Sequence, residues 1–265
     1  MVSYMTGSVA RSSYRERNST ADRALDILLL YTDERLALSG AEIARQLGVA
    51  RSTAYRYLQS LLAAGLVEEG PAGFRIGPRV FDLARLARRG LGLDTAARPV
   101  MRRLCDDLHE TVLLTRRSGS VVVCLDRVGK AGPVPLSYER GHIFPINAGA
   151  AAMVLLAWED QDDIRSVLSE QPLTKLTSRT LTDPDELMTR LRRIRTRGVA
   201  VASGELDEGI VGVAAPVFGR DGEVRAGVSV AVPVSRLTAA RASEMEKGVR
   251  TAAAEIAKRL AAPAS

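Results

Sequence analysis

In the first third of the chain, apolar residues recur at the three- and four-residue intervals of an α-helix. The earliest such stretch begins near Thr20 and shows this spacing at Ala24, Leu25, Leu28 and Leu29. A second helix is expected from Ser39 to about Leu47, because Ser39 and Glu42 have the spacing of a capping box. Gly48 permits the positive φ that ends this helix, and another helical pattern follows directly.

The third predicted helix covers residues 51–62 and has two different faces. At 100° per residue, its apolar side chains gather on one side, namely Ala54, Leu58, Leu61 and Leu62. Polar side chains lie on the opposite side, namely Ser52, Arg56, Gln59 and Ser60. Two short helices joined by a tight turn, the second with a polar outer face, are typical of a helix-turn-helix.

A β-hairpin and a further helix are predicted after the helix-turn-helix. Residues 66–69 and 74–76 predict short strands, because the four residues between 69 and 74 are Gly, Pro, Ala and Gly. A hairpin in this position makes the N-terminal domain a winged helix. From Arg79 to about Leu91 an apolar stripe recurs at helical spacing, with arginines on the other faces. We expect a linker helix there, which could also form a seam between two copies of the chain.

The remaining two thirds of the chain predict an α+β fold with a largely antiparallel sheet. Strands are expected at 112–115, 121–128, 199–202, 211–218 and 224–232. Their apolar residues alternate poorly with polar ones, which indicates strands buried on both faces. Helices are expected at 97–109, at 148–158, from Asp183 to Gly198 and from about Val234 to Leu260.

Composition and charge narrow the class of partner. A chain of 265 residues with 46% hydrophobic residues can bury a core in each of two domains. The net charge is +6, and the excess lies mostly in residues 1–90, which hold 13 arginines against 9 acids. Aromatic residues make up only 4%, so no stacking platform for single-stranded nucleic acid is visible. Double-stranded DNA remains open as a polyanionic partner, although charge alone indicates only a tendency toward non-specific binding.

The outward residues near the N-terminus of a recognition helix reach base edges in the major groove. The candidate DNA contacts are Arg51, Ser52, Thr53, Tyr55, Arg56 and Gln59, together with Arg75 on the wing. Arg56 is the first choice for a base or phosphate contact, because it lies opposite the apolar face. For Ser52, capping the helix is the preferred role. For Arg75, a phosphate contact and simple solvation are equally open.

Other classes of chemistry lack the residues they need. Cys105 and Cys124 are isolated, and His109 and His142 are the only histidines, so neither a metal site nor a catalytic nucleophile with its base is expected. No phosphate-binding or dinucleotide-binding glycine motif is present, so we expect no enzyme activity and no cofactor. The apolar runs are too short for a membrane span, and the start of the chain has no secretion signal, which favours a cytoplasmic protein.

The chain resembles the isocitrate lyase regulator (IclR) family of bacterial transcription factors. The residues that give this resemblance are Ala24–Leu28, Ser39–Leu62, Gly65–Val67, Gly141–Ala157, Gly198–Glu205 and Ala214–Phe218. The first 17 residues are polar and carry three arginines, which predicts a flexible arm that is more readily a solvated tail than a DNA contact. The resemblance implies a winged helix-turn-helix over 18–78, a linker helix over 79–95 and a GAF-like effector domain over 96–262. Family members act as dimers or tetramers on pseudo-palindromic operators, so a homodimer or tetramer is expected.

The effector site departs from the family pattern. Where the family commonly has Pro-Leu-His, this chain has Pro145, Ile146 and Asn147, and Ala152-Met153 replaces a Gly-Lys pair. Members that bind small keto acids offer an Asp, a Cys and two Ser, and the matching positions here are Ala202, Gly212, Ser229 and Ala231. Only Ser229 is polar, so a small carboxylate would lose most of its hydrogen-bond partners.

We therefore expect a regulator, more readily a repressor than an activator, that answers to a larger or more apolar small molecule. Ser229 and Asn147 are the polar groups expected to orient this effector in an otherwise apolar pocket. The alternative is a ligand-blind DNA-binding regulator whose pocket has ceased to bind anything.

Overall fold

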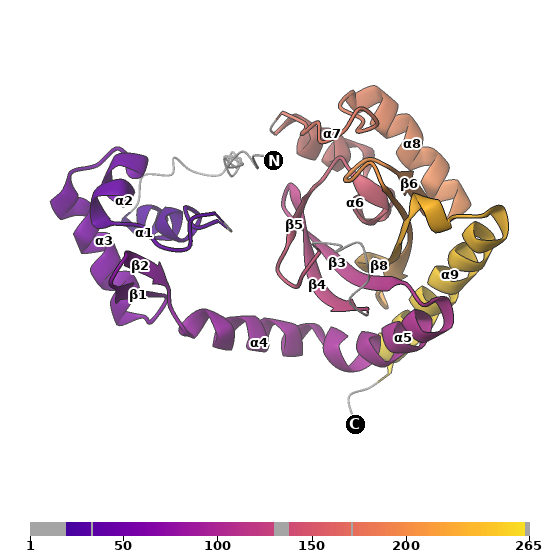
Figure 1. The fold of residues 1–265 in the computed structure, drawn as a ribbon, viewed down its shortest axis with the longest axis horizontal. Coiled ribbons are helices and arrows are strands. Elements are labelled where there is room, and N and C mark those ends of the chain that lie inside the picture. The colour runs from indigo at the N-terminus through magenta and orange to yellow at the C-terminus, as the bar shows by residue number, and fades with distance from the viewer. Residues whose placement is uncertain (1–19, 33, 130–137, 171, 263–265) are drawn as a thin grey trace. The chain divides into compact units, whose positions relative to one another are not determined.

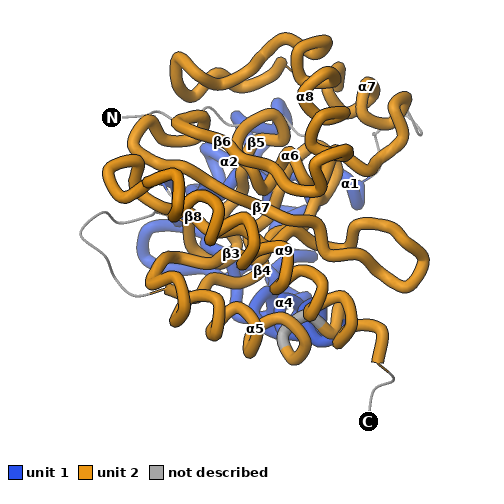
Figure 2. The backbone as a smooth tube through the Cα atoms, turned by 90° about the vertical axis from the view of Figure 1, so that its right-hand side faces the viewer, with its two compact units in different colours: residues 1–90 blue, residues 91–265 orange. Residues whose placement is uncertain are grey.

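The computed structural model describes residues 20–32, 34–129, 138–170 and 172–262. It divides into two compact units, one up to Gly90 and one from Leu91 onward, and each is described by itself (Figures 1 and 2). The expected arm over residues 1–17 lies outside the described residues. Within the described part, no helix is both long enough and apolar enough to cross a membrane.

The N-terminal unit contains four helices and a two-stranded hairpin in its described part. In chain order these are α1 (Thr20–Leu28), α2 (Gly40–Leu47), α3 (Arg51–Ala63), β1 (Val67–Gly70), β2 (Gly73–Ile76) and α4 (Arg79–Leu91). Ile27 of α1, Ile43 of α2, Leu58 of α3 and Phe74 of β2 meet in its core, each exposed by 3% or less. Burying each such side chain contributes about 1.5–3 kcal/mol, which is what holds these short elements together.

The hairpin is tied to the segment that precedes α2. The backbone N–H of Leu38 donates to the carbonyl oxygen of Phe74 over 2.9 Å, and the reverse bond measures 2.8 Å. Gly73 makes this approach possible, because a Cβ at that position would lie 2.6 Å from the Leu38 carbonyl oxygen. The wing is therefore fixed to the helix-turn-helix by backbone bonds as well as by its core residues.

The predicted cap at the start of α2 is present in the structure, whereas the predicted cap at the start of α3 is not. The capping box of α2 is confirmed, with Glu42 N donating to Ser39 Oγ over 3.2 Å and Ser39 N donating to Glu42 Oε2 over 2.8 Å. The prediction that Ser52 caps α3 is wrong. The residue with the extended backbone of an N-cap is Ala50, which places Ser52 inside the first turn, and no side chain makes a capping hydrogen bond at this helix start.

The C-terminal unit is built on one six-stranded sheet. Its elements are α5 (Leu93–Leu108), β3 (Thr111–Ser118), β4 (Val121–Val128), β5 (Ile143–Pro145), α6 (Gly149–Leu156), α7 (Gln161–Ser169), α8 (Pro184–Arg197), β6 (Ala200–Ser203), β7 (Ile210–Phe218), β8 (Val224–Pro233) and α9 (Ala239–Ala261). The strand order is β5-β4-β3-β8-β7-β6, and every neighbouring pair is antiparallel. The predicted α+β class with an antiparallel sheet is confirmed.

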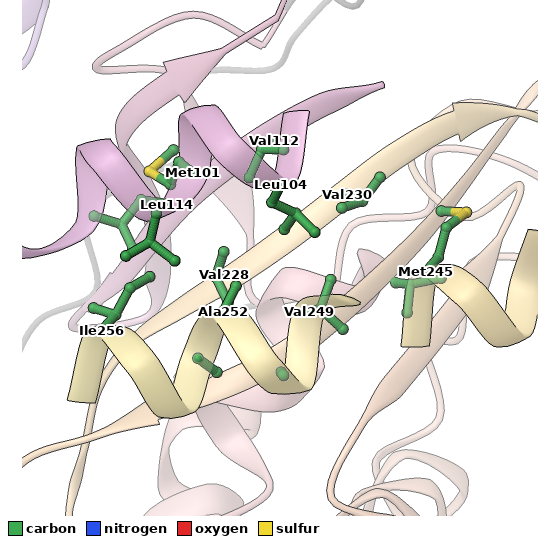
Figure 3. Close-up of a cluster of buried hydrophobic side chains, with 14 of the residues drawn as sticks. Met101, Leu104, Val112, Leu114, Val228, Val230, Met245, Val249, Ala252 and Ile256 are labelled. Carbon is green, nitrogen blue, oxygen red and sulfur yellow. The ribbon is translucent and has the colours of Figure 1, made fainter. Parts of the chain in front are cut away.

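Helices cover both faces of this sheet, which explains the poor alternation of its strands. On one face α5 and α9 pack against β3, β7 and β8, and Figure 3 shows this core of Met, Leu, Val and Ile side chains. Met101, Val230 and Ile256, which come from α5, β8 and α9, are fully buried in it. On the other face the buried helix α6 lies against the sheet, with α7 and α8 outside it.

Several elements of the C-terminal unit differ from the predictions. The strand β5 and the helix α7 are additional to those expected. The last helix begins at Ala239 rather than near Val234, because Thr238 caps it by accepting a hydrogen bond from Arg241 N over 3.2 Å. Residues Val234–Arg236 form a short 3₁₀ turn ahead of this cap.

Candidate DNA interface and effector pocket

The helix α3 presents polar side chains on the face opposite its core. Ala54, Tyr57, Leu58 and Leu61 are buried, whereas Arg51, Ser52, Tyr55, Arg56 and Gln59 are exposed and Thr53 is half-buried. The outward face expected from the sequence is thus the exposed face of the structure. It lies near the N-terminal end of the helix, which is the end that reads bases in helix-turn-helix proteins.

Arg56 has a guanidinium group that is available to an anionic partner. Its Cζ lies 5.9 Å from the ring centroid of the buried Tyr57, an arrangement that favours a cation. No acid in the described part of the chain forms an ion pair with Arg56. The ring below and the solvent above leave the side chain free to donate to a phosphate or to a guanine edge.

Tyr55 has a packing role that the sequence pattern did not indicate. Its ring contacts Phe74 of β2 edge-on, with centroids 5.9 Å apart. It also covers Gly40 at the start of α2, where an added Cβ would lie 2.7 Å from the ring. Tyr55 therefore joins α3 to α2 and to the wing, while 47% of it remains exposed toward the outer face.

Arg75 on the wing already has a partner across the hairpin. Its Nε lies 2.7 Å from Oε1 of Glu68, which is its register partner on β1. Both side chains are largely exposed, so this ion pair contributes little stability. A phosphate that approaches Arg75 would compete with Glu68, and the predicted phosphate contact remains a prediction.

A pocket that is partly open to solvent lies between the sheet and the first turn of α6. Four of the five predicted effector residues line it, namely Ala202, Gly212, Ser229 and Ala231. Most of the other lining residues are apolar, among them Leu113, Tyr138, Phe144 and Ile210. Three small residues form one row across the strands, because Ala202 pairs with Gly212 and Gly212 pairs with Ala231. This row leaves the space that α6 does not fill.

Ser229 supplies an unused hydroxyl in the wall of this pocket. Only 4% of the residue is exposed, and its side chain has no hydrogen bond within the described part of the chain. Buried hydroxyl groups normally have a partner, so this group is suited to a ligand or a trapped water. The residue lies in β8 between Ala214 of β7 and Leu113 of β3.

Glu205 is a lining residue that the sequence reasoning missed. Its carboxylate is 7% exposed, pairs with Arg190 of α8 at 2.6 Å and accepts the backbone N–H of Gly149 at 3.0 Å. It therefore occupies the N-terminus of α6, which is where a small anionic ligand would otherwise be favoured. A single glutamate in a polar turn has the pattern of a solvated residue, and nothing in the sequence relates it to an arginine on another helix.

Asn147 does not line the pocket, and the prediction that it orients an effector is wrong. It is 1% exposed, and its Nδ2 donates to the carbonyl oxygens of Thr174 at 2.9 Å and Leu181 at 2.8 Å. Both N–H groups are used to hold the loop that precedes α8. Thr180 of the same loop donates to the Glu205 carbonyl oxygen at 2.7 Å, so the loop is fixed to the pocket wall from both ends.

Two family models together cover most of the chain. Residues 20–71 match the IclR helix-turn-helix domain, and residues 87–258 match the bacterial transcriptional regulator IclR C-terminal domain. The chain belongs to the IclR family. The resemblance seen in the sequence is confirmed, and the IclR-family protein described here is a DNA-binding transcriptional regulator and not an enzyme.

Relatives agree over nearly the whole length of this IclR-family protein. The transcriptional regulator BhcR of Paracoccus denitrificans is 36% identical over 238 residues, which cover 89% of this chain and 85% of the relative. An IclR transcriptional regulator from Alicyclobacillus acidocaldarius is 25% identical, with a TM-score of 0.79 over 93% of this chain and 100% of that one. An IclR homologue from Microbacterium hydrocarbonoxydans, solved with 4-hydroxybenzoate, is 26% identical, with a TM-score of 0.78 over 91% and 99%.

Proposed function

We propose that this IclR-family regulator is a repressor whose hold on its operator is set by a small molecule bound between α6 and the sheet. The observation behind this proposal is the apolar pocket with the unpartnered Ser229 hydroxyl in its wall. Apolar walls with few polar groups are typical of sites for small organic ligands. The 4-hydroxybenzoate complex of the Microbacterium hydrocarbonoxydans homologue adds support.

The effector is mainly apolar and is not a small keto acid. A keto acid in the floor of the pocket would face Ala202, Gly212 and Ala231, which offer no side-chain donor. It would also meet Glu205, whose negative charge already occupies the amide of α6, with Asp207 at the edge of the lining. A ligand carboxylate beside these two acids would be repelled by them, and each hydrogen bond that the carboxylate loses on leaving water would cost about 1–3 kcal/mol.

DNA binding is proposed to use the outer face of α3 in two copies of the chain. Arg56 is the main base or phosphate contact, with Arg51, Ser52, Thr53, Tyr55 and Gln59 around it and Arg75 on the phosphate backbone. Two recognition helices read half-sites one helical turn or a multiple apart. An effector that binds one arrangement of the paired copies more tightly shifts the population toward that arrangement. The resulting change in operator affinity is limited by the difference between the effector's affinities for the two arrangements.

Repression is the simpler outcome of such binding, because occupancy of a promoter is enough to block transcription. We expect deletion of the gene to raise transcription from the operator-bearing promoter, measured with a reporter. Lower transcription in the deletion strain would instead assign an activator.

Gating is tested with the DNA upstream of the protein's own gene. In an electrophoretic shift assay, fractionated metabolite extract is expected to change the shift with the wild-type protein but not with Ala231→Phe, which fills the pocket. The matched control is Ala254→Phe, which adds the same side chain on an exposed position of α9. An extract that leaves the wild-type shift unchanged would favour a ligand-blind regulator. Micromolar binding of glyoxylate or pyruvate in calorimetry would contradict the proposed effector class.

A further inference from the structure

An arginine on the pocket side of the sheet has no partner for its charge. Arg127 lies in β4 opposite Leu113, and residues directly opposite on antiparallel strands place their side chains on the same face. Leu113 lines the pocket, so Arg127 emerges on the same face of the sheet one strand farther along, just outside the residues that line the pocket. Its Nε is buried without a hydrogen-bond partner, and no ion pair of Arg127 is found among the described residues.

The acids near Arg127 are already taken. Asp126, its neighbour in β4, is 3% exposed and is paired with Arg98 at 2.8 Å and with Arg140 at 2.5 Å. Asp126 pairs with Leu114 in the register, so its side chain lies on the opposite face of the sheet from that of Arg127. Glu205 in the pocket is held by Arg190 and by the Gly149 amide. Asp126 is therefore neutralised on its own face by Arg98 and Arg140, and neither acid is paired with Arg127.

A buried N–H donor without an acceptor is costly, so the Nε of Arg127 calls for a partner that the described residues do not provide. The cross-strand row supplies the geometry of that partner. Ser229 pairs with Leu113, and Leu113 pairs with Arg127. Neighbouring strands lie about 4.8 Å apart, so about 10 Å separates the Ser229 backbone from the Arg127 backbone. The row therefore presents a hydroxyl, an apolar side chain and a cation in that order.

We propose that Arg127 anchors the anionic end of the effector, which is an elongated amphipathic monocarboxylate. This inference rests on the proposed effector pocket and names the class of molecule that fills it. The carboxylate accepts paired hydrogen bonds from the Arg127 guanidinium, the apolar body crosses Leu113, and the far end reaches the Ser229 hydroxyl. The anion thereby stays away from Glu205 and Asp207, and this arrangement explains why a pocket unsuited to small keto acids has a cation at its end.

The probes are 6-phenylhexanoate and its neutral amide, 6-phenylhexanamide, measured by calorimetry on the full-length protein. The wild type is expected to bind the acid at least tenfold more tightly than the amide. Arg127→Met is expected to weaken acid binding at least tenfold and to leave amide binding unchanged, with Arg127→Lys between the two because it keeps the charge but loses the fork. Arg116→Met is the matched control, since Arg116 lies on the neighbouring strand and, by register, on the other face of the sheet.

Stability gives a second measurement that does not depend on the probe. Arg127→Met is expected to melt at the same temperature as the wild type or higher, because it removes a buried N–H donor that has no acceptor. A lower melting temperature would assign Arg127 a structural partner and overturn the proposal.

Three binding results would also overturn it: equal affinity for acid and amide, no binding of the acid, or acid binding by Arg127→Met equal to that of the wild type. Ala231→Phe separates these failures from a failure of the pocket itself. If both probes bind the wild type and Arg127→Met equally but do not bind Ala231→Phe, the proposed pocket is supported and the proposed role of Arg127 is refuted. If neither probe binds while metabolite extract still changes the DNA shift, only the effector class falls.

Discussion

Arg56 is the residue whose substitution gives the most direct test of operator recognition by a single side chain. It lies on the exposed face of α3 with the Tyr57 ring beneath its guanidinium group. We expect Arg56→Ala to weaken binding to the operator by about 1–3 kcal/mol, because a forked contact to a base is worth about that much. Fluorescence anisotropy on the operator and on a scrambled duplex measures the specific part of this loss.

Loss of one positive charge also weakens binding to any DNA, so a charge-matched control is needed. Arg35→Ala removes an exposed arginine outside α3 and is expected to affect both duplexes alike. Unchanged operator affinity in Arg56→Ala would refute the assignment of Arg56 to a base.

At the residue scale, exposure could be predicted from the sequence, but polar partnerships could not. The outer face of α3 follows from the 100° repeat alone. The partners of Asn147 are 27 and 34 residues away, and the Gly149–Glu205 bond spans 56 residues. Those bonds depend on how α6, α8 and the sheet pack, which no local pattern records. The predicted capping role of Ser52 was wrong for a simpler reason: the helix starts two residues earlier than a cap at Ser52 requires, and only the residue at the start can cap it.

At the scale of elements, the start of α2 offers a test that depends on pH. Hydrogen bonds from the Ser39 side chain and backbone lower the pKa of Glu42 below its ordinary value of 4.5. A lowered pKa means that the stabilising contribution is fully present above pH 4.5 and is lost as the pH falls through the lower folded value. Ser39→Ala is expected to cost about 1 kcal/mol at neutral pH, as N-cap replacements do.

Hydrogen exchange of the α2 amides measures this cost at pH 7 and in acid. The difference between wild type and Ser39→Ala is expected to shrink in acid, because protonated Glu42 no longer supports the cap. A difference of the same size at both pH values would mean that the carboxylate contributes nothing to the cap.

Strongly patterned elements of the C-terminal unit could be predicted, and marginal ones could not. The strands β7 and β8 are long and apolar, and α6 is buried on nearly all sides. By contrast, β5 has three residues and ends in Pro145, so it shows no strand pattern. The nine-residue α7 buries only Ile164, Val167 and Leu168, and a helix of that length depends on its packing against α8.

At the scale of the whole molecule, the apolar surface of α4 predicts a second copy of the chain as partner. None of its residues is buried, and Phe81, Leu83 and Leu86 are 78%, 45% and 49% exposed. Leu83 and Leu86 are three residues apart and share one side of the helix, whereas Phe81 lies on another side, and this much exposed apolar surface is more than a solvated helix needs. We expect Leu83→Lys with Leu86→Lys to shift the protein to monomer in sedimentation velocity and to weaken operator binding, because paired half-sites require paired helices.

Leu36→Lys is the control for that experiment, since Leu36 is 71% exposed but lies outside α4. It is expected to sediment like the wild type. A double variant that sediments like the wild type would place the dimer contact elsewhere on the molecule.

The row formed by Ala202, Gly212 and Ala231 sets the width of the pocket by having almost no side chains. Register in this part of the sheet comes from backbone hydrogen bonds, which a change of side chain leaves in place. A methyl group added at Gly212 would only touch the Cβ of Ala150, 3.4 Å away. Under the proposed function, substitutions in this row would change the effector that fits in steps of one methyl group, without altering the residues of α3 that are proposed to contact DNA.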